Sequence, residues 1–139
     1  MKESIFFRIL AIFIFSGLFL GCAKDTGTTP DQTDARANFI GRWSVSETWT
    51  KLSYEVTIAT DPNSTNGVFI ANFANTGFSG IPAGATINGK AITLDPNQVI
   101  GEGLTINGGG NLSGSKILWT YTLDDGATRI NAVATYTKQ

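Results

Sequence analysis

Histidine is absent from the 139 residues, and cysteine occurs once, at position 22. A site that pairs histidine with a serine or cysteine nucleophile cannot be assembled from this composition. A zinc site with the usual nitrogen and sulfur ligands is excluded on the same ground, and a single cysteine forms no intramolecular disulfide. The sequence therefore predicts a protein that is not an enzyme and that holds no metal or other cofactor.

An excess of positive charge is also missing. Ten Lys and Arg residues face eleven Asp and Glu residues, for a net charge of −1. Nothing in this balance attracts a phosphate backbone, so nucleic acid is not an expected partner.

Charge is lacking altogether in the 12-residue apolar run Ile9–Leu20, which follows Lys2 and Arg8. A run of this length is typical of an export signal and is short for a membrane-spanning helix.

The segment Phe19-Leu20-Gly21-Cys22, at the end of this run, resembles the lipobox of bacterial lipoproteins. The resemblance implies that residues 1–21 are a signal peptide and that Cys22 begins the mature chain and carries the lipid. Two or more acyl chains anchor a protein stably to a membrane. Ala23 follows the cysteine where Asp would favour the inner membrane, so the resemblance implies the outer membrane. The periplasmic and surface faces both stay open.

A tether and one domain are expected to follow. Ala23–Thr29 has no aromatic or large aliphatic side chain, which indicates a flexible segment. Thr29-Pro30-Asp31-Gln32 has the residue order of a helix start, so one prediction is a short helix over Pro30–Asn38. The other is a disordered polar stretch, because so short a helix is marginal. We therefore expect a tether over residues 22–38 and a single domain over residues 39–139.

From Phe39 onward, apolar side chains recur at every second position, as in half-buried strands. Tight turn sequences such as Asn88-Gly89 separate the runs and leave no room for crossover helices. We expect an all-β, eight-stranded antiparallel up-and-down barrel, with a two-sheet sandwich as the alternative. Within it, Gly108-Gly109-Gly110 predicts a bulge, a bend or a close backbone approach. The expected strands are Arg42–Trp49, Leu52–Thr60, Gly67–Phe73, Ala85–Ile87, Ala91–Leu94, Gly103–Leu112, Lys116–Leu123 and Thr128–Lys138.

The entry to the first strand carries a recognisable pattern. Phe39, Gly41 and Trp43 give F-x-G-x-W, which resembles the calycin group of lipocalins and fatty-acid-binding proteins. The resemblance implies that Trp43 packs at the closed end of the barrel beneath a cation, either Lys138 or Arg129. At 101 residues the domain is shorter than a typical lipocalin, and no helical lid fits between its first two strands. We therefore expect a small cavity.

One carboxylate falls on an apolar face of the first strand. Glu47 alternates with Trp43, Val45 and Trp49. Inside a barrel it would have to be paired, neutralised or solvated, and it could orient a ligand. We favour a bend that carries Glu47 to the rim. The residues predicted to contact a ligand at the barrel mouth or in its interior are Glu47, Trp49, Tyr54, Phe69, Phe73, Trp119 and Tyr121.

Two functions compete for this barrel. The first is binding of a small apolar or amphipathic molecule, which needs an interior cavity of roughly 300 Å³ or more. The second is a solid barrel that docks an envelope protein partner through Phe78 and Ile81 of the Asn75–Gly84 loop. This loop could instead fold over and plug the barrel.

Overall fold

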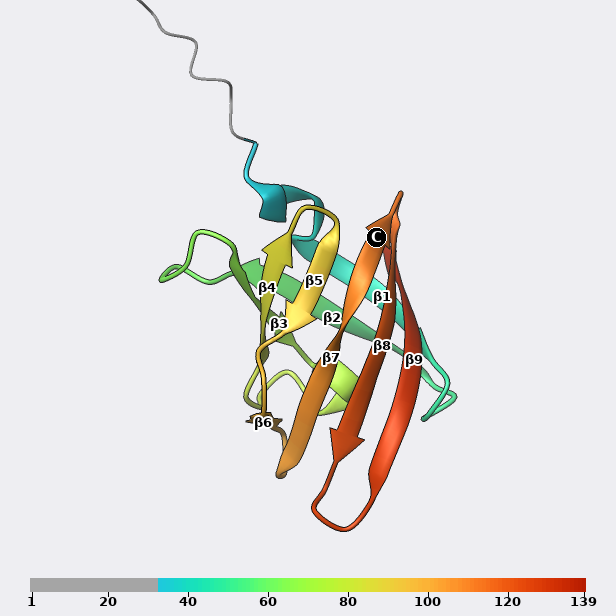
Figure 1. The fold of residues 1–139 in the computed structure, drawn as a ribbon. Helices are drawn as coiled ribbons and strands as arrows, with labels where there is room; N and C mark the ends of the chain where they lie inside the picture. Colours follow the sequence, from blue (N-terminus) through green and yellow to red (C-terminus); the bar gives the residue numbers. More distant parts are fainter. Residues whose placement is uncertain (1–32) are drawn as a thin grey trace, which may run out of the picture. The chain divides into compact units, whose positions relative to one another are not determined.

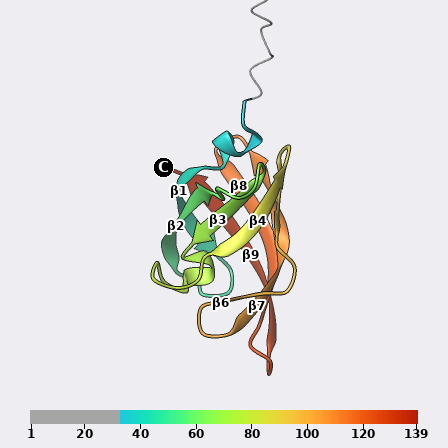
Figure 2. The same cartoon turned by 90° about the vertical axis from the view of Figure 1, so that its left-hand side faces the viewer.

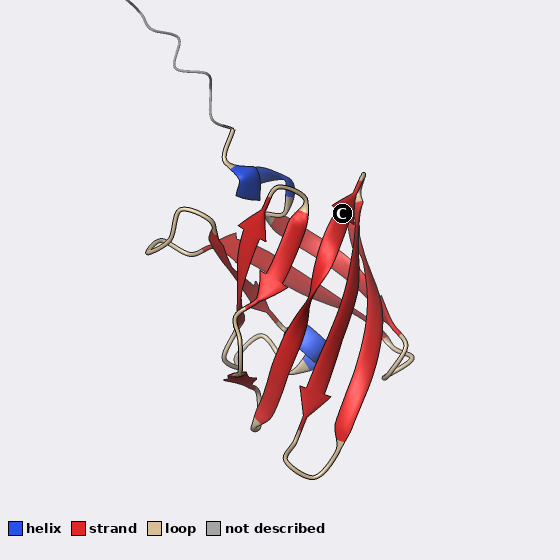
Figure 3. Cartoon of the chain, viewed as in Figure 1, coloured by secondary structure: helices blue, strands red, loops and turns tan. Residues whose placement is uncertain are grey.

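The computed structural model of the chain describes residues 33–139. The predicted signal peptide, the lipid attachment at Cys22 and the start of the predicted helix Pro30–Asn38 lie outside these residues. Within the described part, two short turns of 3-10 helix accompany a set of β-strands (Figure 3). None of the helices in residues 33–139 is long and apolar enough to cross a membrane.

Nine antiparallel strands within residues 33–139 form one sheet (Figure 1). They are β1 (Gly41–Glu47), β2 (Ser53–Thr60), β3 (Gly67–Ala71), β4 (Ala83–Asn88), β5 (Ala91–Leu94), β6 (Gln98–Ile100), β7 (Leu104–Ser113), β8 (Lys116–Asp124) and β9 (Arg129–Lys138). Strand β1 pairs with β9, and β5 pairs with β7, so eight of the nine close into an up-and-down barrel. This confirms the predicted fold, and Figure 2 shows the same strands turned by 90°.

Alternation along each strand places its apolar side chains inside the barrel. In β8, Ile117, Trp119, Tyr121 and Leu123 are buried, and the residues between them are not. In β9 the inward residues include Ala132, Ala134 and Tyr136. The apolar core therefore lies inside the barrel.

The three consecutive glycines lie where β7 passes from one neighbour to the next. A Cβ on Gly110 would lie 3.0 Å from the Trp119 ring, and one on Gly109 would lie 2.8 Å from the Ile92 carbonyl oxygen. Gly108 has a φ of +143°, and a Cβ there would collide with the backbone of β8. Of the three predicted alternatives, a bulge, a bend or a close backbone approach, the structure shows the close approach, because the barrel closes at this point and no side chain fits between the strands.

Strand β6 was not predicted, since three residues after Asp95-Pro96-Asn97 carry little periodic signal. It pairs with the first residues of β7. The Gln98 side chain also extends to β4, where its amide donates to the Gly84 carbonyl and accepts from the Gly84 N–H, both at 2.7 Å. This amide satisfies the backbone of β4 just beyond the end of its pairing with β5, which begins at Ala85.

One end of the barrel, which we call the Trp43 end, is covered by a 3-10 helix, η1 (Ala35–Asn38). Within its described part, the predicted helix Pro30–Asn38 is thus a single turn, capped by the Asp34 carboxylate. Arg36 holds this turn against the barrel by donating to the carbonyls of Asp61, Ser64 and Gly67 at 2.7–3.3 Å. The turn therefore packs with the barrel instead of forming part of a free tether.

The F-x-G-x-W segment lies at this end. The buried Trp43 indole donates to the Phe39 carbonyl at 2.8 Å. The Lys138 ammonium lies 5.3 Å from the centre of the Trp43 ring and donates to the Asn38 carbonyl. Lys138 is therefore the cation over Trp43, and Arg129 is not, because it pairs with Asp124 beside the β8–β9 turn.

Candidate ligand site in the barrel interior

The opposite end of the barrel, where β1 ends, is the Glu47 end, and its interior contains an unusual group of side chains. Within residues 33–139, five buried side-chain polar atoms have no hydrogen-bond partner. All five belong to inward-facing residues of β1, β2, β8 and β9. We call these residues the interior polar site: Glu47, Tyr54, Trp119, Tyr121 and Tyr136.

Strand register explains how these residues come together. Ala134 pairs with Glu47 on one side and with Trp119 on the other, so a methyl group separates these two larger side chains. Ala132 likewise pairs with Tyr121. The Trp119 ring leans over Gly110, on the side away from Ala134. The two alanines therefore form a floor of small residues between longer polar side chains.

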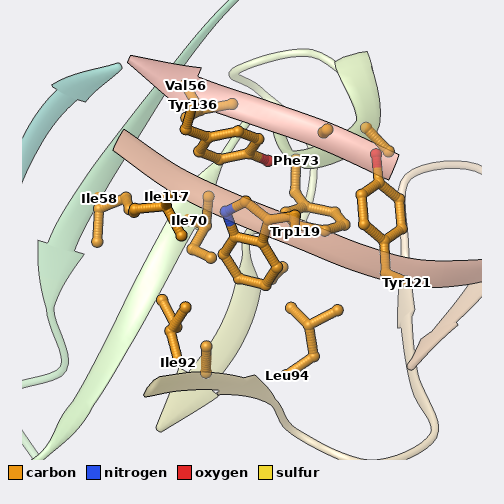
Figure 4. Packing of buried hydrophobic residues seen from close by; sticks show 14 of the residues in the cluster. Val56, Ile58, Ile70, Phe73, Ile92, Leu94, Ile117, Trp119, Tyr121 and Tyr136 are labelled. Atoms are coloured by element: carbon orange, nitrogen blue, oxygen red, sulfur yellow. The ribbon is translucent and has the colours of Figure 1, made fainter. Parts of the chain in front are cut away.

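A short segment, which we call the covering segment, packs against Trp119 and Tyr121. After β3, Asn72 adopts a left-handed backbone conformation, and its amide donates to the Glu55 carbonyl and accepts from the Gly77 N–H, both at 2.7 Å. The chain thereby turns inward into a second 3-10 turn, η2 (Phe73–Asn75). The Phe73 ring centre lies 5.5 Å from that of Trp119 and 4.8 Å from that of Tyr121. Figure 4 shows this aromatic group among the aliphatic side chains of the core.

The covering segment is strained. Ala74 is buried with φ +52° and ψ +29°, and Asn75 has φ +59°. A left-handed conformation at a residue other than Gly, Asn or Asp costs on the order of 1–2 kcal/mol. Strain of this kind occurs at sites where a segment moves or a ligand binds.

Glu47 is inside the barrel, with only 4% of its surface exposed. The prediction that a bend carries it to the rim is wrong, because β1 continues through Glu47 before the chain turns. One carboxylate oxygen accepts from the Thr50 hydroxyl at 3.3 Å, and the other has no partner. Burial raises the pKa of the Glu47 carboxyl above its ordinary value, although the nearby Thr50 and Tyr54 hydroxyls partly oppose the shift.

Two tyrosines lie near this carboxyl. Burial and the negative charge of Glu47 both raise the pKa of the Tyr54 phenol. Burial raises the pKa of Tyr136 as well, with further contributions from Tyr54 and Glu47. Both phenols therefore stay protonated, so each hydroxyl can donate one hydrogen bond and accept others.

The structure brings together five of the seven predicted contact residues: Glu47, Tyr54, Phe73, Trp119 and Tyr121. Trp49 is 46% exposed, because β1 has ended and the residue lies in the following turn. Phe69 is 37% exposed, because its neighbours Val68 and Ile70 point inward. Phe73 also differs from the expectation, since β3 ends at Ala71 and η2 delivers its ring.

Tyr136 was missing from the predicted site. It lies on the inward face of the last predicted strand, so the alternating pattern placed it in the core. Which side chains lie beside Tyr136 depends on the strand register, in which it pairs with Val45 of β1 and Ile117 of β8. The alternating pattern alone does not give this register. The Tyr136 and Trp119 ring centres are 5.5 Å apart.

Exposed apolar side chains surround the Glu47 end. Trp49 and Leu52 lie in the β1–β2 loop, and Phe78 and Ile81 lie in the loop before β4. Phe78 is 59% and Ile81 is 64% exposed, so these two do not plug the barrel, whereas Phe73 does. Beside η2 there is a surface hollow of ≈ 290 Å³, lined by Ala74, Asn75, Thr76, Glu102 and Leu104.

In the part of the chain that the structure describes, no group of three or more Asp or Glu residues could hold a metal ion. In the comparisons with known proteins, no family model matches the chain, and no curated protein matches it.

Proposed function

We propose that the chain is a non-enzymatic, lipid-anchored envelope protein whose barrel binds a small amphipathic ligand at the Glu47 end. The observation that supports ligand binding is the interior polar site, in which five buried polar atoms lack a hydrogen-bond partner. The anchor is supported by the sequence around Cys22.

The energetic argument concerns unpaired polar groups. A buried donor or acceptor left without a partner costs about 1–3 kcal/mol, and native proteins hold only a few such groups per 100 residues. Here they are gathered on neighbouring strands at one end of the barrel instead of being scattered. A ligand that pairs several of them at once regains this free energy on binding, which favours a polar head inside the site.

The surroundings of the site suit an apolar tail. Phe73 and Ala74 form the strained cover of the site, and exposed apolar residues flank it in two loops. Displacement of η2 would give the head access to the floor formed by Ala132 and Ala134. The tail would then lie against Phe78 and Ile81, where contact with the ligand removes apolar surface from water.

The test is direct capture of a ligand. The chain from residue 22 to 139, with Cys22→Ser to prevent lipidation, is incubated with bacterial envelope extract, repurified and measured by native mass spectrometry. We expect a stoichiometric small adduct and a shift of tryptophan emission, because Trp119 lies in the site. The matched variants are Ala134→Leu, which fills the floor, and Thr135→Leu, which changes the neighbouring residue on the same strand.

Loss of the adduct in Ala134→Leu but not in Thr135→Leu places the ligand inside the barrel. Because a larger residue at position 134 can overpack the core, Tyr136→Phe serves as a second, isosteric variant. A protein that emerges from the extract with the mass of the chain alone, and with unchanged emission, contradicts ligand binding.

The anchor has its own test. Full-length protein expressed in bacteria with radiolabelled palmitate should incorporate the label, and Cys22→Ser should abolish incorporation. An inhibitor of lipoprotein signal peptidase should make the uncleaved precursor accumulate. Label that remains in Cys22→Ser contradicts the assignment.

A second candidate function is docking of an envelope protein through the loop before β4. The high exposure of Phe78 and Ile81 favours it, since exposed apolar clusters mark interaction sites. A photo-crosslinking residue at position 78 should then capture one defined protein in intact cells. Ile81→Ser should reduce that capture, and Val99→Ser, on an exposed strand residue outside the loop, should not.

A further inference from the structure

The kind of head group that fits the interior polar site can be argued from its unpaired atoms. Glu47 Oε1 and the hydroxyls of Tyr54 and Tyr136 are three buried oxygens without a well-formed hydrogen bond, and the Tyr54 hydroxyl lies beside the Glu47 carboxyl. A carboxylate oxygen accepts hydrogen bonds, and a phenol oxygen can accept one while its own O–H donates. A primary ammonium has three N–H donors and no acceptor. The number and type of unpaired oxygens therefore match one ammonium group.

Charge points to the same chemistry. None of the salt bridges within residues 33–139 involves Glu47, and the cations that form them pair with Asp34, Glu55 and Asp124. Lys138 lies at the other end of the barrel, over Trp43. A buried carboxylate without a counter-charge is unfavourable, and an opposite charge within a few ångströms stabilises its ionised form. A cationic ligand would supply this counter-charge.

The aromatic rings add to the match. Trp119 and Tyr136 have ring centres 5.5 Å apart at an interplanar angle of 43°, and the Phe73 ring packs edge-on against Trp119. A cation within about 6 Å of such a ring is attracted to its face, most strongly when it is removed from water. A cation beside Glu47 and Tyr136 would therefore also benefit from these rings.

We propose that the ligand of the barrel carries a primary ammonium head bound by Glu47, Tyr54 and Tyr136. This inference rests on the proposed function. A quaternary ammonium would suit the rings but would leave all three oxygens unpaired. A carboxylate head would meet the like charge of Glu47. The Trp119 N–H, which can only donate, is left for an oxygen atom elsewhere on the same ligand.

The experiment uses three six-carbon probes that differ only in their heads: hexylamine, hexanol and hexanoate. Each is titrated into the chain from residue 22 to 139 with Cys22→Ser, followed by tryptophan emission and calorimetry. The same titrations are done with Glu47→Gln and with Glu55→Gln. Glu55 is the matched control, because it is also on a barrel strand but pairs with Arg42 and Gln139 outside the barrel.

We expect hexylamine to bind more tightly than the other two probes. Glu47→Gln should weaken it by at least about thirtyfold, since one partner of a buried charge pair is lost. Glu55→Gln should leave it unchanged. Because Glu47→Gln keeps the size of the side chain, it tests charge without opening a cavity.

Two results would overturn the inference. Equal binding of hexanol or hexanoate in a site that Ala134→Leu blocks would show a ligand site with a different head preference, and the proposed function would stand. Absence of binding by all three probes also refutes the ammonium head. In that case capture of a ligand from envelope extract decides separately whether the barrel binds ligands.

Discussion

Removal of one hydroxyl should make the protein more stable and a weaker binder. Tyr136 is fully buried, and its hydroxyl has no hydrogen-bond partner. Tyr136→Phe keeps the ring and its packing against Trp119 and removes only the unpaired oxygen. Because an unpaired buried polar group costs about 1–3 kcal/mol, the free energy of unfolding should rise by roughly that amount. For a domain of about 100 residues, each kcal/mol corresponds to a Tm increase on the order of 4–8 °C.

The measurement is urea unfolding at equilibrium, followed by circular dichroism, together with a hexylamine titration of the same variant. Tyr→Phe substitutions that break a buried hydrogen bond lower stability, so an increase is diagnostic. We expect the same variant to bind hexylamine about tenfold more weakly, because one acceptor is lost. A variant that is less stable than the parent by about 1 kcal/mol would refute the reasoning, since the hydroxyl would then be hydrogen-bonded in the free protein.

Three other tests of the structure use substitutions. Trp43→Phe should destabilise more than Trp119→Phe by about 1–3 kcal/mol in urea unfolding, because only the Trp43 indole is hydrogen-bonded; equal losses would contradict this. Gly110→Ala should cost about 1–3 kcal/mol, because its Cβ would crowd the Trp119 ring, whereas Gly80→Ala, in a loop with ordinary contacts, should be nearly neutral in thermal unfolding. Glu47→Gln should stabilise the protein at neutral pH, and this advantage should shrink as the pH falls through the raised pKa of folded Glu47 toward 4.5, the ordinary pKa of the group, and stay constant below it. The pKa of Glu47 is higher in the folded protein than in the unfolded chain. The stability that depends on its proton is therefore fully present below the unfolded-state pKa and is lost as the pH rises through the folded-state pKa. A benefit that did not change with pH in unfolding experiments would contradict the burial of an ionisable group.

The barrel could be predicted from the sequence because its signals are local. Apolar residues at every second position give the strands, and short turns give antiparallel neighbours. The F-x-G-x-W pattern also placed Trp43 under a cation, although two cations were open. The choice of Lys138 depends on the distance of the last strand residue from the ring, which only the register between β1 and β9 supplies.

The interior polar site could be predicted only in part, because its assembly is non-local. The alternating pattern of the sequence continues through both Glu47 and Trp49. In the structure β1 ends at Glu47, so Glu47 is inside the barrel and Trp49 is exposed. The left-handed conformation of Asn72 decides that Phe73 turns inward. Strand propensity predicts that the strand continues to Phe73. The hydrogen bonds of the Asn72 amide end it instead at Ala71.

The Gln98 amide has a consequence for the motions of the barrel. Strands β8 and β9 pair along their full length, whereas β5 and β7 pair only from Ala91–Asn111 to Thr93–Gly109. Beyond these three residue pairs, the barrel wall is held together by two hydrogen bonds between the Gln98 side chain of β6 and the Gly84 backbone of β4. Local opening has the lowest free energy where few backbone hydrogen bonds must break. In deuterium exchange, amides of β5 should therefore exchange earlier than those of β8, so that the barrel opens first along one defined line while the rest of its wall remains folded.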